Sequence, residues 1–174
     1  MSLVAKAAPV LLALGGNLGD VAATFDEACA CLDQWMGPIR RASLYQSRAM
    51  YMHDQPDFIN SAALGWSDLA PFEILHRIKQ LEQRLGRTAG PRFGPRIIDL
   101  DLVYYGDHIL DIPDLVIPHP RRLERSFVLV PMAELAPDFQ DPATGECLAA
   151  LAERLAEPTS LSQLPDASMS EPAH

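Results

Sequence analysis

Residues 95–105 place two carboxylates, Asp99 and Asp101, inside an otherwise apolar run. The Ile, Leu, Val and Tyr content of this run predicts a β-strand, in which side chains alternate between two faces. Asp99 and Asp101 are therefore expected on the same face. The opposite face carries an apolar stripe of Ile98, Leu100, Leu102 and Tyr104. That stripe must face a core, so the strand is constrained to a sheet that is covered on this face.

The aspartate pair itself has two interpretations. D-x-D is a short and common pattern, so the two acids can belong to an ordinary solvated strand face. On an apolar strand, however, they would repel each other and lose hydration unless a cation lay between them. Hard divalent cations prefer oxygen ligands, and Mg²⁺ commonly takes one or two carboxylates together with phosphate oxygens. We therefore expect Asp99 and Asp101 to bind metal.

Positive charge is concentrated in two places, although the chain is acidic overall. The net charge is −9, yet six of the 14 Lys and Arg residues lie in 77–96 and three more in 121–125. Guanidinium groups beside paired carboxylates are typical of a site that holds a polyphosphate through both metal and arginine. An acidic body disfavours the long phosphate backbone of nucleic acid. A small, highly charged ligand is the better interpretation.

Length and composition predict a single domain. With 174 residues and 48% hydrophobic content, the chain can bury a sizeable core. We identify no signal peptide and no apolar run near the ~20 residues of a membrane span, and we expect a cytoplasmic protein. Its three cysteines are expected to be reduced. The predicted organisation is an N-terminal segment at 1–8, one domain at 9–156 and a disordered tail at 157–174.

The order of the predicted elements indicates the fold class. Strands are predicted at 9–14, 39–47, 58–66 and 95–105, and helices at 21–36 and 71–86. Asp20 is expected to cap the first helix and Pro71 to open the second. The order β-α-β-β-α-β predicts an α+β, ferredoxin-like core, with an antiparallel sheet and both helices on one face. A strand at 115–117 and a helix at 127–135 follow as C-terminal additions.

Six short motifs then occur in the order and spacing of a known family. They lie at 14–20 (LGGNLGD), 54–60 (DQPDFIN), 81–87 (LEQRLGR), 94–101 (GPRIIDLD), 117–119 (IPH) and 125–127 (RSF). Each is weak alone, but together they make residues 9–140 resemble 6-hydroxymethyl-7,8-dihydropterin pyrophosphokinase of folate biosynthesis. The resemblance implies that the pyrophosphoryl group of ATP passes to the hydroxymethyl oxygen of the pterin, and that AMP is released.

The resemblance also implies roles for individual residues. Asp99 and Asp101 would hold two Mg²⁺ ions, and Arg87 and Arg96 would act with them in catalysis. ATP would be bound by Leu75, Lys79, Glu82, Arg87, Arg96, Leu102, Leu115, His119 and Arg125. The pterin would be bound by Ser47, Met50, Phe58, Asn60, Phe93, Asp99 and Phe127. The implied partners are ATP and a pterin, without nucleic acid or membrane, for a monomer or at most a weak homo-oligomer.

Several of these residues also have an ordinary structural explanation. The leucines and phenylalanines can be core residues, and Lys79 and Glu82 can be an intrahelical ion pair. The chain also departs from the family pattern in the loop at 48–52, and Phe93 stands where relatives often carry Trp. Two alternatives therefore stay open. One is a D-x-D metal-dependent nucleotidyltransferase, and the other is a catalytically inactive ferredoxin-like binding module.

Overall fold

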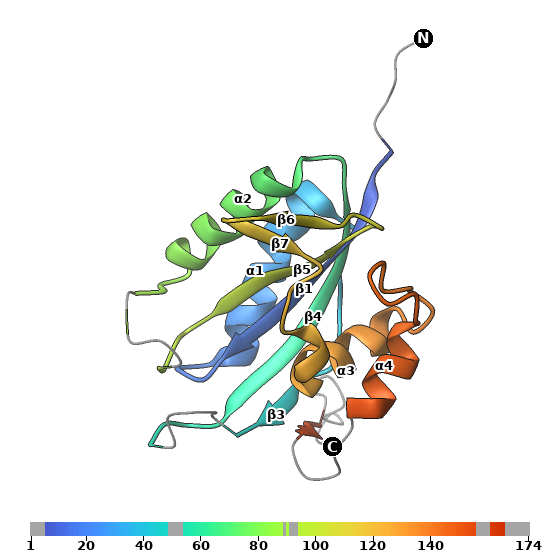
Figure 1. Ribbon diagram of the computed structural model, residues 1–174. Helices are drawn as coiled ribbons and strands as arrows, with labels where there is room; N and C mark the ends of the chain where they lie inside the picture. Colours follow the sequence, from blue (N-terminus) through green and yellow to red (C-terminus); the bar gives the residue numbers. More distant parts are fainter. Residues whose placement is uncertain (1–5, 49–53, 89, 91–93, 156–160, 166–174) are drawn as a thin grey trace, which may run out of the picture.

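The elements follow the predicted order up to the aspartate strand in the computed structural model, which describes residues 6–48, 54–88, 90, 94–155 and 161–165 (Figure 1). They are β1 (Ala8–Gly16), α1 (Val21–Met36), β2 (Arg40–Arg41), β3 (Tyr45–Ser47), β4 (Phe58–Ser67), α2 (Pro71–Arg84), β5 (Asp99–Tyr105), β6 (Leu110–Ile112), β7 (Leu115–Ile117), the 3₁₀ turn η1 (Arg122–Glu124), α3 (Ser126–Leu135), α4 (Leu148–Leu155) and β8 (Leu161–Gln163). The strand predicted at 39–47 is thus divided into β2 and β3.

The main sheet has the strand order β5-β1-β4-β3-β8, and β2 also pairs with β4. Every pairing in it is antiparallel. The first and last strands of the predicted core, β1 and β5, therefore lie side by side, with β4 next to β1. This arrangement confirms the predicted α+β, ferredoxin-like fold.

Helices cover both faces of the sheet (Figure 1). On one face, α1 and α2 pack Phe25 and Ile78 against Leu100 of β5. On the other, α3 and α4 pack Leu129 and Leu148 against further residues of β1 and β4. The prediction placed the first two helices correctly, but the C-terminal additions do more than extend the fold. They bury the second face of the sheet and so form one wall of any site on that face.

The local signals for the first two helices act as expected. The Asp20 side chain caps α1 by accepting a hydrogen bond from the Ala23 N–H at 3.1 Å. Gly37 follows the last residue of α1, and Pro71 is the first residue of α2. Glu82 is an exception to the polar exterior of α2, because only 3% of this residue is exposed.

β5 contains a bulge, which changes the face of its last residues. Leu11 pairs with Tyr104 and Leu12 with Leu102, so Val103 is the extra residue on β5. Tyr104 consequently packs on the α3 side, away from Leu102. The prediction that Tyr104 shares a face with Leu102 is wrong. Asp99 and Asp101 precede the bulge and do share a face, opposite Gly15 and Ala13 of β1.

The segment after α4 contains a strand within the stretch predicted to be disordered. β8 pairs with β3, with Leu161 opposite Ser47, and the Leu164 N–H donates to the Leu44 carbonyl at 2.8 Å. The disorder prediction for 157–174 is therefore wrong at Leu161–Gln163. β8 completes an edge of the sheet that would otherwise end at β3.

Two further observations concern the cysteines and the helices. Cys29, Cys31 and Cys147 are all free thiols, as predicted. Within the described part of the chain, every helix is too short or too polar to cross a bilayer.

Candidate active site

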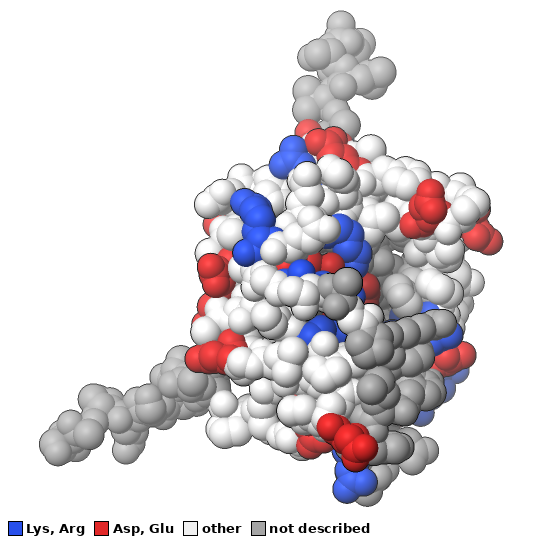
Figure 2. All heavy atoms as spheres, turned by 90° about the vertical axis from the view of Figure 1, so that its left-hand side faces the viewer, with Lys and Arg blue, Asp and Glu red and all other residues white. Residues whose placement is uncertain are grey.

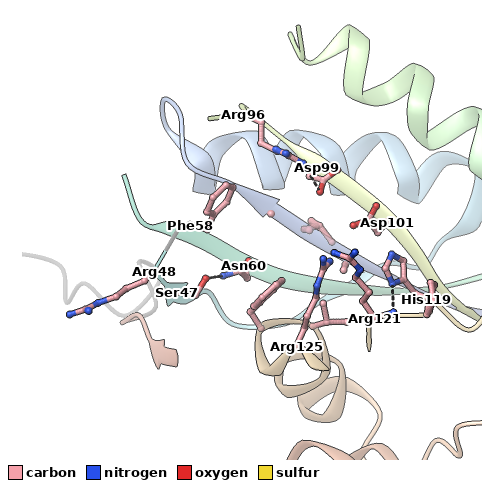
Figure 3. A pocket seen from close by; sticks show the side chains of 16 residues that line it. Ser47, Arg48, Phe58, Asn60, Arg96, Asp99, Asp101, His119, Arg121 and Arg125 are labelled. Atoms are coloured by element: carbon pink, nitrogen blue, oxygen red, sulfur yellow. Dashed lines mark hydrogen bonds and ion pairs between the residues drawn. The ribbon is translucent and has the colours of Figure 1, made fainter. Parts of the chain in front are cut away.

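A pocket of about 410 Å³ opens on the α3 side of the sheet, where β1, β4 and β5 meet the corner formed by residues 118–125 between β7 and α3 (Figure 3). Nine of the predicted site residues line it. They are Ser47, Phe58, Asn60, Arg96, Asp99, Asp101, His119, Arg125 and Phe127. Antiparallel pairing of β4 and β5 with β1 brings together pocket residues that are up to 88 positions apart in the chain, as Ala13 and Asp101 are. The fold thus places residues from five of the six sequence motifs around one cavity.

The two aspartates on β5 have different partners. The Asp99 carboxylate accepts hydrogen bonds from Arg87 Nη1 at 2.8 Å and from Arg96 Nη1 at 3.2 Å. Asp101 lies 3.8 Å from Lys79 Nζ, and 33% of its side chain is exposed. The molecular surface in Figure 2 accordingly shows acidic and basic atoms side by side at the centre of one face. Both aspartates line the pocket, but Asp99 is neutralised by two arginines, whereas Asp101 has a lysine nearby.

Asp101 is held in an environment that disfavours its negative charge. Burial raises the pKa of its carboxyl group to about 6, and the neighbouring charge of Asp99 contributes in the same direction. Lys79 and Arg125 oppose this change without cancelling it. A site that penalises two nearby carboxylates in this way gains stability when a cation binds between them.

Glu82 connects α2 to the outer edge of β5. Its carboxylate accepts from the Leu100 N–H at 2.6 Å and from Lys79 Nζ at 3.1 Å, and it lies 2.9 Å from Arg87 Nη1. Lys79 also donates to the Leu100 carbonyl at 3.0 Å. The backbone of an edge strand is thereby satisfied by side chains. Neither Glu82 nor Lys79 lines the pocket. Glu82 orients Arg87, and Lys79 lies beside Asp101.

His119 presents one ring nitrogen to the pocket. Its Nδ1 accepts a hydrogen bond from the Arg121 N–H at 3.2 Å. Burial and the charge of Arg125 lower the pKa of His119 to about 4, so the ring is neutral near pH 7. In a neutral ring whose Nδ1 is an acceptor, Nε2 carries the proton. His119 can therefore donate a hydrogen bond to an anion in the pocket.

The other end of the pocket brings aromatic rings together with an amide (Figure 3). Phe58 and Phe127 both line it, and the Arg125 guanidinium lies 5.6 Å from the centre of the Phe127 ring. Asn60 is 4% exposed and donates from Nδ2 to Ser47 Oγ at 2.8 Å. This bond fixes the orientation of the Asn60 amide. Rings and a fixed amide suit a flat heterocycle with a polar edge.

Three of the remaining predicted residues belong to the core on the other face of the sheet. Leu102 and Leu115 are buried in the α1–α2 side of the core, and Leu75 packs against it. Met50 and Phe93 fall outside the described residues. The pocket is also lined by Arg48 and Arg121, to which sequence reasoning assigned no role. Arg121 belongs to the second basic window, and that clustering was the signal for it.

The donor set at Asp99 and Asp101 fits a hard divalent cation. Among the residues that the structure describes, no three His, Cys, Asp or Glu side chains form a metal-binding group. Asp99 and Asp101 would supply two carboxylates, and phosphate oxygens and water would complete the coordination. Mg²⁺ favours this combination.

The fold and the pocket together define a class of ferredoxin-like proteins whose carboxylates and arginines suit a small phosphorylated ligand. A family model described as 7,8-dihydro-6-hydroxymethylpterin-pyrophosphokinase (HPPK) matches residues 11–137. The chain belongs to the HPPK family.

Curated relatives carry related names. The chain is 42% identical over 147 residues to 2-amino-4-hydroxy-6-hydroxymethyldihydropteridine pyrophosphokinase of Synechocystis, covering 83% of this chain and 75% of that protein. It is 37% identical over 135 residues to the Bacillus subtilis protein of the same name, covering 76% and 81%. Another relative is longer. The folic acid synthesis protein fol1 of Pneumocystis carinii is 37% identical over 149 residues, which are 85% of this chain but 20% of that protein.

A solved structure shows the same fold at low sequence identity. The wild-type HPPK-DHPS of Plasmodium falciparum, crystallised with pteroate, matches with a TM-score of 0.69 at 14% identity. The match covers 88% of this chain and 43% of that one. The chain thus spans less than half of this solved protein.

Proposed function

We propose that this HPPK-family chain transfers the pyrophosphoryl group of ATP to the hydroxymethyl oxygen of 6-hydroxymethyl-7,8-dihydropterin and releases AMP. The observation that carries the proposal is the division of one pocket into two chemically distinct ends. Phe58, Asn60 and Phe127 suit a flat ring with a hydrogen-bonding edge, and Asp99 and Asp101 lie among basic side chains. A reaction that joins a pterin to a polyphosphate uses both ends at once.

The basic side chains around the pocket would hold the triphosphate. Arg96, Arg121 and Arg125 line the cavity, and His119 offers its Nε2–H from the same side as Asp101. In-line attack requires the nucleophile and the phosphates to be aligned, with the negative charge balanced along the chain. Arginines suit this task because the guanidinium group binds phosphate oxygens in a bidentate manner.

Asp99 and Asp101 would hold Mg²⁺, for which we propose two ions. When bound, the metal would supply positive charge to the phosphate oxygens. Arg87 and Arg96 now occupy both oxygens of Asp99. ATP would offer these arginines phosphate oxygens in exchange, and Asp99 would then become available to the cation. Glu82 would support the exchange by orienting Arg87, and Lys79 would support it from its place beside Asp101.

The pterin end would work through ring stacking and one fixed amide. We propose that Phe58 and Phe127 stack on the pterin, and that Asn60, oriented by Ser47, reads its edge. Each stacking contact would contribute about 0.5–1.5 kcal/mol beyond the burial of area. We keep the prediction that Leu75, Leu102 and Leu115 lie beside the adenine. All three belong to the core on the α1–α2 side of the sheet.

Product analysis tests the proposed reaction. The protein is incubated with ATP, Mg²⁺ and 6-hydroxymethyl-7,8-dihydropterin, and the nucleotides are separated by chromatography. We expect AMP and the diphosphorylated pterin in equal amounts, with no AMP when the pterin is omitted or when EDTA is added. Release of free pyrophosphate would favour a nucleotidyltransferase, and absence of any product would favour a binding module.

We also propose that the protein is cytoplasmic and is a monomer or at most a weak homo-oligomer. Its net charge of −9 disfavours binding to nucleic acid, and we propose that it does not bind membranes. Light scattering coupled to gel filtration checks the oligomeric state.

A further inference from the structure

A buried ion pair lies directly behind the pocket. Arg122 is 6% exposed and Asp141 is fully buried. Arg122 Nε and Nη2 donate to the two carboxylate oxygens of Asp141 at 2.6 and 3.0 Å, so the pair is bidentate. Tyr104 joins it, because its hydroxyl donates to Asp141 at 2.6 Å and accepts from Arg122 Nε at 3.2 Å. Asp141 also accepts from the backbone N–H groups of Ala143 and Thr144.

The third nitrogen of the Arg122 guanidinium points back to the pocket corner. Its Nη1 donates to the His119 carbonyl at 3.0 Å, and the Arg122 N–H donates to the same oxygen at 3.2 Å. On the other side, the His119 N–H donates to the carbonyl of Val103, the bulge residue of β5, at 3.0 Å. The backbone of His119 is therefore held at both ends, by β5 and by Arg122.

Two adjacent arginines in this corner face opposite ways. Arg121 lines the pocket, whereas Arg122 is turned into the protein interior. The Arg121 N–H donates to His119 Nδ1, so the orientation of the imidazole depends on the backbone path between these residues. Arg122 closes that path by bonding to the His119 carbonyl. A small change at Arg122 would thus displace the side chains of both His119 and Arg121.

We propose that Arg122, held by Asp141 and Tyr104, is a positioning residue that fixes the corner presenting His119 and Arg121 to the phosphate end of the pocket. The proposal deepens the proposed function and rests on it. Stability alone is a weak explanation for the network, because buried ion pairs can often be replaced by apolar side chains without loss. The observed hydrogen bonds require a planar group whose three nitrogens donate in different directions. The guanidinium of Arg is such a group, and the single ammonium nitrogen of Lys is not.

Kinetics of Arg122→Lys test the proposal. Lysine keeps the charge for Asp141 but cannot bond to Asp141 and the His119 carbonyl in the same geometry. We expect kcat/KM for ATP to fall about 10- to 100-fold, as for other residues that orient a site from behind. The KM for the pterin should stay within about twofold. The proposal would be overturned if KM rose equally for ATP and the pterin, or if kcat/KM for ATP did not change.

A matched control separates positioning from stability. Leu151 of α4 is buried in the core cluster that also contains Tyr104. Leu151→Ala should lower the melting temperature by creating a cavity, and it should leave kcat/KM for ATP unchanged at a temperature where both variants are folded. If Leu151→Ala reproduces the kinetic loss of Arg122→Lys, the network is merely structural. A double-mutant cycle with His119→Gln adds a second criterion, since we expect the two effects to be strongly non-additive.

A spectroscopic measurement decides the matter independently of catalysis. The chain has 5 His residues, and their imidazole nitrogens can be observed by ¹⁵N NMR, with His119 assigned from His119→Gln. The wild type should show His119 as a single neutral tautomer with Nδ1 unprotonated. Arg122→Lys should shift or broaden these signals, whereas Leu151→Ala should not. Unchanged signals in Arg122→Lys would contradict the proposal, even if the wild type were found to form no AMP.

Discussion

Asp99 and Asp101 are two residues apart on β5, yet their surroundings differ. Both oxygens of Asp99 accept hydrogen bonds from arginines. Asp101 lies 3.8 Å from Lys79, and the pKa of Asp101 is raised to about 6. Two carboxylates in one pocket are easier to accommodate when one of them is already neutralised. At the scale of single residues, Asp101 is therefore the side chain whose change most directly tests cation binding.

Asp101→Ala should abolish most of the activity without harming the fold. Removal of a carboxylate that holds the metal should lower the rate of AMP formation about 100- to 1000-fold. The melting temperature should stay equal or rise slightly, because the variant also removes repulsion from Asp99. Parallel assays of activity and thermal unfolding check this expectation. Near-normal turnover would show that the metal is bound elsewhere.

Asn60→Ala should affect the pterin much more than ATP. The Asn60 amide is 4% exposed and is oriented by the bond to Ser47 Oγ. A ligand edge left without its partner typically loses about 1–3 kcal/mol, which is roughly 5- to 140-fold in affinity. Calorimetric titration with the pterin and with an ATP analogue measures both effects. Equal losses for the two ligands would argue against a role in reading the ring.

At the scale of elements, the approach of β1 to the segment before β5 determines where the aspartates lie. A Cβ atom on Gly16 would lie 2.6 Å from the backbone carbonyl oxygen of Ile97. Backbone atoms cannot move aside cheaply, so Gly16→Ala should push apart the strand that ends at Gly16 and the strand that begins at Asp99. We expect a loss of about 1–3 kcal/mol in the free energy of unfolding, measured with urea.

The neighbouring glycine is the matched control for this prediction. A Cβ atom on Gly15 would lie 3.6 Å from Asn60 Oδ1, which is ordinary van der Waals contact. Gly15→Ala should therefore unfold at nearly the wild-type urea concentration. The explanation from strand contact is wrong if Gly15→Ala is destabilised as much as Gly16→Ala.

The helix cap and the helix start, which depend on local signals, were predicted correctly, whereas the bulge in β5 and the strand β8, which depend on pairing, were not. The cap at Asp20 and the opening of α2 at Pro71 are encoded within a few residues. The bulge at Val103 depends on the register between β5 and β1, which no local pattern in β5 reveals. Pairing of Leu161–Gln163 with β3 likewise joins residues more than 100 positions apart, in a stretch whose composition suggested disorder.

At the scale of the whole molecule, the Arg122–Asp141 pair links the sheet, the corner and the loop before α4, so it should influence global unfolding. Burial alone would raise the pKa of Asp141, but hydrogen bonds from Arg122, Tyr104 and two backbone N–H groups hold it below the ordinary value. A lowered pKa means that the charged form stabilises the fold above the unfolded pKa of about 3.9. That contribution is lost as the pH falls through the folded pKa.

Asp141→Asn should therefore cost stability in a pH-dependent way. At neutral pH it leaves Arg122 buried without its counterion, which typically costs about 3–5 kcal/mol. The difference in unfolding free energy between wild type and variant should narrow as the pH drops below about 4. Urea titrations at a series of pH values measure this difference. A gap that stays constant down to pH 2 would contradict the assignment.

The candidate site shows the same division between what sequence motifs reveal and what they do not. Motif matching predicted nine residues of the pocket lining, including Phe58 and His119, because their spacing is characteristic. It gave no role to Arg122, since its partner Asp141 lies 19 residues away in a different element. It also did not foresee that Arg87 and Arg96 would both pair with Asp99, because such pairing depends on how β5 and α2 pack.

The proposed reaction requires one pocket to hold the phosphates of ATP between the β5 carboxylates and the surrounding arginines. A crystal structure with a non-hydrolysable ATP analogue, Mg²⁺ and the pterin tests it most directly. We expect metal on Asp99 and Asp101, with Arg87 and Arg96 moved from Asp99 to phosphate oxygens. The proposed reaction is contradicted if Arg87 and Arg96 remain paired with Asp99 and the triphosphate lies outside the pocket.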